Sequence, residues 1–127
     1  MPQEAGEKPE ALVIEDHPDI ADIFVRSLSE AGFETTLFQD GFDALKYLRT
    51  TTPAVVSLDL HLPEISGMDI LREIRSDERL ADTRVILVTA DQHLAKTVEK
   101  DADLVLLKPV SFTQLRDLAA RIAAKLD

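Results

Sequence analysis

Cysteine is absent from this sequence of 127 residues. Its absence excludes disulfide bonds, thiolate nucleophiles and cysteine-based zinc or iron–sulfur sites, and it fits a reducing cytoplasm. Long apolar runs are absent too, since none approaches the roughly 20 residues that a membrane-spanning helix needs. The chain begins MPQEAGEKPE, which is polar and contains proline, unlike a signal peptide. We therefore expect a soluble, cytoplasmic protein with no membrane segment.

Positive charge is also scarce. The chain carries 14 lysine and arginine residues against 24 aspartate and glutamate residues, a formal net charge of −10. Nucleic-acid backbones and anionic membranes are bound chiefly through positive charge, so neither is an expected direct partner. Carboxylates in such excess suit a hard divalent cation instead. Apolar residues make up 45% of the chain, enough to bury the core of one domain of this length.

Short apolar runs recur along the chain, and most are continuous rather than alternating. Continuous runs of this length are typical of strands buried on both faces of a parallel sheet. The second run is the most polar, which predicts a strand at the edge of the sheet. The runs lie at Ala11–Ile14, Thr35–Phe38, Ala54–Leu58, Val85–Val88 and Leu104–Leu107.

Segments of helical periodicity separate these runs and follow the last one. The clearest closes the chain and carries Leu115, Leu118, Ile122 and Leu126 on one stripe. The weakest is Gln92–Lys100, whose apolar face is thin. Alternating strands and helices predict an α/β fold with helices on both sides of a parallel sheet and right-handed crossovers. We expect residues 1–10 to form a flexible leader and residues 11–127 to form one domain.

Polar side chains with complementary chemistry follow four of the five apolar runs. Because the carboxyl ends of parallel strands meet at one edge of the sheet, we expect these side chains to converge there. Three carboxylates in close proximity repel one another unless a cation neutralises them, and Mg²⁺ is the natural choice. The residues are Glu15, Asp16, Asp59, Thr89 and Lys108.

Each of these residues also has a purely structural interpretation when taken alone. Asp16 and Thr89 suit helix starts, Asp59 suits a loop, and Lys108 suits a solvated strand end. Together they match the needs of phosphoryl transfer, which depends on positioning and charge neutralisation. A carboxylate can also act as the nucleophile toward phosphorus, giving an aspartyl phosphate.

Five short motifs in order make the sequence similar to the receiver domain of two-component response regulators. The resemblance runs from about Ala11 to Leu126, and it implies a flavodoxin-like fold: five helices and a five-stranded parallel sheet in the order 2-1-3-4-5. The motifs are Leu12-Val13-Ile14-Glu15-Asp16, Leu58-Asp59-Leu60-His61-Leu62-Pro63, Gly67-Met68-Asp69, Val88-Thr89-Ala90 and Leu107-Lys108-Pro109.

The resemblance implies a role for each polar residue near the phosphoryl group. Asp59 resembles the phosphoacceptor, which takes a phosphoryl group from a histidine kinase or a phosphotransfer protein. Thr89 resembles the switch hydroxyl that bonds the phosphoryl oxygens, and Lys108 resembles the cation that pairs with them. The Lys108–Pro109 bond resembles the family's cis peptide.

The resemblance also implies a Mg²⁺ site. Glu15 and Asp16 resemble the acidic pair that holds the ion, together with Asp59 and the backbone carbonyl of His61. The imidazoles of His17 and His61 are expected at the surface, near the site. Asp91, two residues after Thr89, is expected on the same rim.

Three features depart from the family pattern. Glu15 stands where aspartate is more common in the acidic pair. Val105 stands at the aromatic switch position, so no large ring is available there to swing inward or outward. The stretch from Thr89 to Lys108 is shorter than usual by roughly one helical turn, which predicts that the fourth helix or its flanking loops are reduced. We therefore carry over no standard dimer and expect a monomer or a weak dimer.

The sequence supports a signalling module rather than an enzyme, with an unidentified downstream protein as partner. The resemblance implies an output surface over the fourth helix, the fifth strand and the fifth helix. An alternative is an interaction domain that works without phosphorylation, which Val105 and the short fourth segment suggest. A Mg²⁺-dependent phosphohydrolase is disfavoured because His61 stands where a second acid is needed. A flavin site is excluded because the acidic loop after the first strand repels phosphate.

Overall fold

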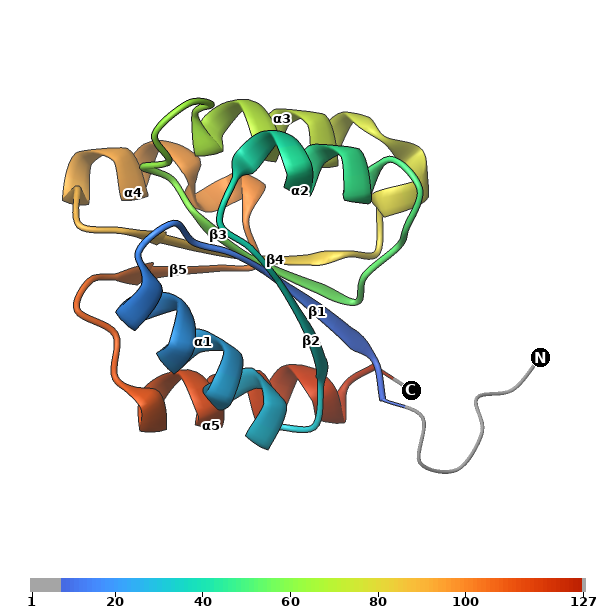
Figure 1. Ribbon diagram of the computed structural model, residues 1–127, viewed down its shortest axis with the longest axis vertical. Coiled ribbons are helices and arrows are strands. Elements are labelled where there is room, and N and C mark those ends of the chain that lie inside the picture. Colours follow the sequence, from blue (N-terminus) through green and yellow to red (C-terminus); the bar gives the residue numbers. More distant parts are fainter. Residues whose placement is uncertain (1–7, 127) are drawn as a thin grey trace.

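A five-stranded parallel sheet forms the centre of the computed structural model, which describes residues 8–126 (Figure 1). The strand order is β2-β1-β3-β4-β5, as predicted, and β2 lies at an edge. Its polar composition is tolerated there because an edge strand is less enclosed. The strands are β1 (Glu10–Ile14), β2 (Glu34–Phe38), β3 (Val55–Asp59), β4 (Arg84–Thr89) and β5 (Leu104–Leu107).

Helices cover both faces of the sheet. Figure 1 shows α1 and α5 on one face and α2, α3 and α4 on the other. Two short 3₁₀ helices, at Glu78–Leu80 and Glu99–Asp101, complete the connections. No helix within residues 8–126 is long and apolar enough to cross a bilayer. The α-helices are α1 (Pro18–Glu30), α2 (Gly41–Leu48), α3 (Gly67–Ser76), α4 (Gln92–Val98) and α5 (Phe112–Ala124).

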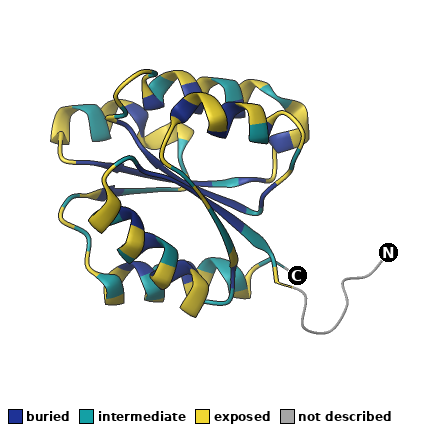
Figure 2. Ribbon diagram, viewed as in Figure 1, coloured by how far each residue is buried: buried dark blue, intermediate teal, exposed yellow. Residues whose placement is uncertain are grey.

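The core consists of two apolar layers, one on each face of the sheet. Along β1, Leu12 and Ile14 belong to the layer under α2 and α3, whereas Ala11 and Val13 belong to the layer under α1 and α5. All four side chains are buried, as are those of β3 (Figure 2). Burial on both faces explains why these strands are mostly apolar in the sequence and do not alternate with polar residues.

The helix before β5 is the shortest α-helix of residues 8–126, in the stretch where the sequence predicted a reduction. Helix α4 has only seven residues and one buried side chain, Val98, before the chain tightens into the 3₁₀ helix at Glu99–Asp101. Val105 on β5 is half-buried and packs against the core layer on the α4 side of the sheet. An aliphatic side chain therefore occupies the position where the family pattern has an aromatic ring.

Polar bonds fasten α3 to the amino-terminal end of the sheet, away from the predicted site. The Arg75 guanidinium donates to the Asp101 and Thr83 carbonyl oxygens at 2.8 and 3.1 Å and to Asp103 Oδ2 at 3.0 Å. Asp103 Oδ2 also accepts the Val85 amide at 2.7 Å. The entry into β5 is thus held by α3 and β4 although α4 is short.

Candidate functional site

The predicted polar residues meet at the carboxyl edge of the sheet. Asp59 and Thr89 are the last residues of β3 and β4, and Glu15 directly follows β1. Lys108 directly follows β5, where its amide donates to the Thr89 carbonyl oxygen at 2.9 Å. The Lys108–Pro109 peptide is cis. Adjacent parallel strands therefore bring residues distant in sequence to one place, as the strand-end argument predicted.

Three carboxylates form the acidic part of the site. Glu15, Asp16 and Asp59 each offer an oxygen, and these oxygens all lie within 4.8 Å of one another. Glu15 and Asp59 are only 1% and 2% exposed, so little water screens their charges. Neighbouring carboxylates in such a place strongly favour a cation or a proton.

Lys108 supplies the positive charge nearest to these acids. Its Nζ donates to Asp59 Oδ2 at 3.2 Å and lies 3.5 Å from Glu15 Oε1. The other Asp59 oxygen, Oδ1, accepts the backbone N–H of His61 at 2.9 Å. Both oxygens of Asp59 are thus oriented, one by an ammonium group and one by an amide.

Glu15 is a buried acid with one carboxylate oxygen left without a hydrogen bond. Its Oε2 accepts the His17 amide at 3.2 Å, whereas its buried Oε1 accepts no hydrogen bond from residues 8–126. Burial and the negative charge of Asp59 raise the pKa of Glu15 to about 7, against the opposing effects of the His17 amide and Lys108. Burial without a hydrogen bond is costly for a carboxylate oxygen, so Glu15 gains from a further cation.

This donor set fits Mg²⁺. The ion prefers carboxylate and carbonyl oxygens and retains several waters, and Asp16 lies on the solvent side of the two buried acids. The unpartnered Oε1 of Glu15 is an oxygen that such an ion would satisfy. The metal would therefore be held by Glu15, Asp16 and Asp59. At position 15 a glutamate, although longer than the aspartate of the family pattern, still places its carboxylate in this cluster.

Thr89 is fully buried and has two hydrogen-bond partners. Its Oγ1 accepts the Asp91 backbone N–H at 3.0 Å, and a second hydrogen bond of 3.0 Å joins Oγ1 to His61 Nε2. The second bond was not predicted from the sequence, which assigned only the carbonyl of His61 to the site. His61 is exposed, as expected, yet its imidazole reaches the buried hydroxyl.

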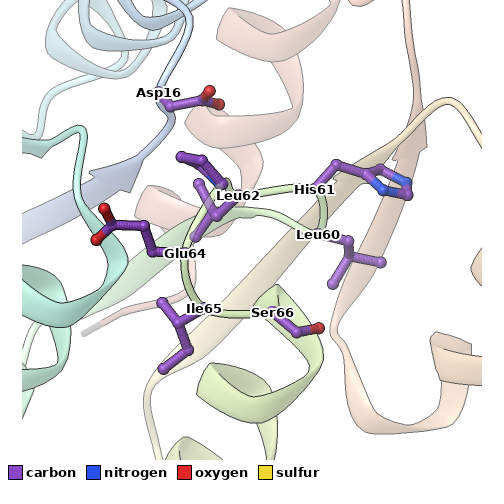
Figure 3. Close-up of a pocket in the computed structure, with 8 residues that line it drawn as sticks. Asp16, Leu60, His61, Leu62, Glu64, Ile65 and Ser66 are labelled. Atoms are coloured by element: carbon purple, nitrogen blue, oxygen red, sulfur yellow. The ribbon is translucent and has the colours of Figure 1, made fainter.

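A hollow of about 410 Å³ opens beside the acidic cluster. Figure 3 shows the side chains of the residues that line it, with the imidazole of His61 directed away from Asp16 and Glu64. The segment from Leu60 to Ser66, which joins β3 to α3, lines most of this hollow. Of the residues assigned to the site, Asp16 and His61 line this hollow.

Gly67 allows this loop to close tightly against the end of β3. A Cβ atom at position 67 would lie 2.5 Å from Leu60 Cα and 2.6 Å from the Asp59 carbonyl oxygen. Both contacts are with backbone, so Gly67→Ala forces the loop and the start of α3 apart. We expect a loss of about 1–3 kcal/mol in the free energy of unfolding, measured with urea. Arg72→Ala, at an exposed position of the same helix, is the control, and an equal loss in both variants would contradict this account.

With this geometry established, comparison with known proteins identifies the family. Residues 11–120 match the model of the response regulator receiver domain. The chain belongs to this family. A receiver domain is a signalling module of two-component systems rather than an enzyme, and its acidic pocket corresponds here to Glu15, Asp16, Asp59 and Lys108.

Relatives of this receiver domain include transcription regulators. The chain is 32% identical over 115 residues to the DNA-binding response regulator MtrA of Mycolicibacterium smegmatis, covering 91% of this chain and 49% of that protein. It is 34% identical over 119 residues to the transcriptional regulatory protein BaeR of Escherichia coli, covering 90% and 46%. The chain therefore spans about half the length of these curated relatives.

A solved structure of similar fold is the beryllofluoride-activated DrrB receiver domain. It is 26% identical in sequence and superposes with a TM-score of 0.81, and the match covers 94% of this chain and 100% of that chain. This agreement confirms the predicted fold.

Proposed function

We propose that this receiver domain accepts a phosphoryl group on Asp59 from a histidine kinase or a phosphotransfer protein, in a reaction that depends on Mg²⁺. One observation carries the proposal: a buried aspartate lies within hydrogen-bond distance of a lysine ammonium group and beside two further acids. The beryllofluoride-activated relative supports it, since its name records activation by a phosphoryl mimic.

In the proposed reaction, Asp59 is the nucleophile. A carboxylate oxygen forms a bond to phosphorus, while the bond from phosphorus to the donor's imidazole nitrogen or acyl oxygen breaks and the donor retains the electron pair. The Lys108 ammonium and the His61 amide hold the carboxylate in place. When bound, Mg²⁺ adds positive charge that neutralises and orients the phosphoryl oxygens. The His61 carbonyl is proposed as one of its ligands.

Phosphorylation changes the contacts of Thr89. The hydroxyl gains a new acceptor, a phosphoryl oxygen, and that difference in contacts shifts the protein between two packings. We place the resulting partner surface over α4, β5 and α5, where Leu107 is 43% exposed. The partner is a downstream protein, with no direct contact to nucleic acid or membrane, and the domain works in the cytoplasm as a monomer or weak dimer over residues 11–127.

The alternative is a receiver-like interaction domain that needs no phosphorylation. The short α4 and the aliphatic Val105 favour it, because both alter the region expected to respond. The buried Asp59–Lys108 pair opposes it, because an ion pair of this kind stabilises a fold little. The two functions differ in whether the chain takes up phosphate.

Phosphate uptake from acetyl phosphate separates the two functions. We expect the wild-type protein with Mg²⁺ to show a slower band on a phosphate-affinity gel, because phosphate is attached to it. The shift should disappear in Asp59→Asn and in wild-type protein with the metal chelated. Asp69→Asn, an exposed acid on α3, is the matched control and should shift normally. A wild type that shows no shift would favour the interaction domain.

A further inference from the structure

One histidine links the two residues that matter most to the proposed switch. The backbone N–H of His61 donates to Asp59 Oδ1 at 2.9 Å, and its ring Nε2 is joined to Thr89 Oγ1 at 3.0 Å. Within residues 8–126 the other partner of Thr89 Oγ1 is the amide of Asp91. On β5, the residue that pairs in register with Thr89 is Leu107, whose side chain is aliphatic and offers no hydrogen bond. His61 is therefore the one side chain among the described residues that is hydrogen-bonded to the Thr89 hydroxyl.

The hydrogen-bond partners of Thr89 indicate which group donates in the bond between Thr89 Oγ1 and His61 Nε2. Oγ1 already accepts the Asp91 amide, so the hydroxyl hydrogen needs an acceptor, and Thr89 is fully buried. If the imidazole donated, two donors would point at Oγ1 and the hydroxyl hydrogen would have no acceptor among the described residues. If the Thr89 hydroxyl donates to His61 Nε2, every group is satisfied. The second arrangement costs less, because a buried unpaired donor is expensive.

A phosphoryl oxygen needs that same hydrogen. Phosphoryl oxygens accept hydrogen bonds, and Thr89 has one hydrogen to give. The hydroxyl must therefore leave His61 before it can bond a phosphoryl group on Asp59. We propose that His61 is a positioning residue that holds the Thr89 hydroxyl in the unphosphorylated state and so opposes the switch. This inference rests on the proposed function.

The consequence is measurable as affinity for a phosphoryl mimic. His61→Phe keeps a ring but lacks the acceptor, so it frees the Thr89 hydroxyl. We expect it to bind beryllofluoride with Mg²⁺ about two- to tenfold more tightly than wild type, the range that one net hydrogen bond of ~0.5–1.5 kcal/mol implies. His93→Phe on α4, whose ring makes no hydrogen bond within residues 8–126, is the matched control and should leave the affinity unchanged.

A double-mutant cycle with Thr89→Val shows whether His61 acts through Thr89. Valine keeps the shape of threonine but has no hydroxyl, so His61→Phe should have no effect on beryllofluoride affinity in that background. Binding is followed by amide NMR on the full chain. An equal effect of His61→Phe in both backgrounds would overturn the inference, as would unchanged or weaker binding by His61→Phe alone. If the wild type itself failed to bind beryllofluoride, the proposed function would fail together with this inference. If only the inference about His61 were wrong, the wild type would still bind, so the two failures are distinguishable.

Discussion

Lys108→Met is expected to lower the free energy of unfolding by roughly 2–3 kcal/mol at pH 8 without divalent cations, and to abolish phosphate uptake. Removing one partner from a buried ion pair leaves an uncompensated charge, which costs about 3–5 kcal/mol. The cost here falls below that range, because the Lys108 side chain is 22% exposed. The carboxylates of Asp59 and Glu15, each 2% exposed by side chain, then repel each other with no ammonium between them.

Urea unfolding of wild type and variant in chelating buffer measures this loss. Lys46→Met, at an exposed position of α2, is the matched control because it removes the same charge and adds the same side chain. At pH 5 the loss should be smaller, since Glu15, whose pKa is raised, is then protonated. Equal stability of the two variants at pH 8 would show that Lys108 does not compensate the acids.

Stability of the metal-free protein is expected to fall as the pH rises from about 4.5 to about 7. Glu15 has a pKa of about 7 in the folded protein and of 4.5 when unperturbed, because burial and the charge of Asp59 disfavour its ionised form. Between these pH values the folded state holds a proton that the unfolded state has released. The stabilisation that this proton gives the folded protein is therefore present below the unfolded pKa of Glu15, and it is lost as the pH rises through the folded pKa. It amounts to about 3 kcal/mol in all.

Comparison with Glu15→Gln isolates this contribution from that of the other acids. Glutamine has no proton to release in this pH range, so the stability of the variant should fall less as the pH rises. Urea unfolding in chelating buffer measures the stability of both proteins. A metal ion that binds the folded state and not the unfolded state stabilises the protein. Saturating Mg²⁺ should therefore raise the stability of the wild type, and most at pH 8, where Glu15 is ionised. Parallel pH profiles for the two proteins would contradict the account of Glu15.

The fold was predictable because strands buried on both faces of a sheet appear in the sequence as short apolar stretches. The apolar runs located every strand, and the thin face of Gln92–Lys100 located the shortened α4. Four strands differ from the runs by one residue at one or both ends. Where a strand is longer than its run, the added residue is polar, because backbone pairing continues through polar side chains, whereas β3 begins one residue later than its run, at Val55. Glu10 pairs in register with Glu34, and its carboxylate accepts hydrogen bonds from Thr36 and Tyr47.

The candidate site was predictable only in part. Strand ends place Glu15, Asp59 and Lys108 together whatever their side-chain conformations. The bond between His61 and Thr89 joins residues 28 positions apart and depends on the path of the loop after β3 and on one side-chain rotamer. Pairing of Asp59 with Val88 puts these loops side by side, so known strand register would have indicated the contact. The raised pKa of Glu15 likewise depends on distances that periodicity does not reveal.

The central claim is that Asp59, among three neighbouring acids, carries the phosphoryl group. Borohydride reduces an aspartyl phosphate to homoserine, which marks the modified residue for peptide mass spectrometry. After treatment with acetyl phosphate and Mg²⁺, we predict homoserine at position 59 and unmodified Glu15 and Asp16. A reduced residue at position 15 or 16, or no reduced residue in protein that has taken up phosphate, would contradict the claim.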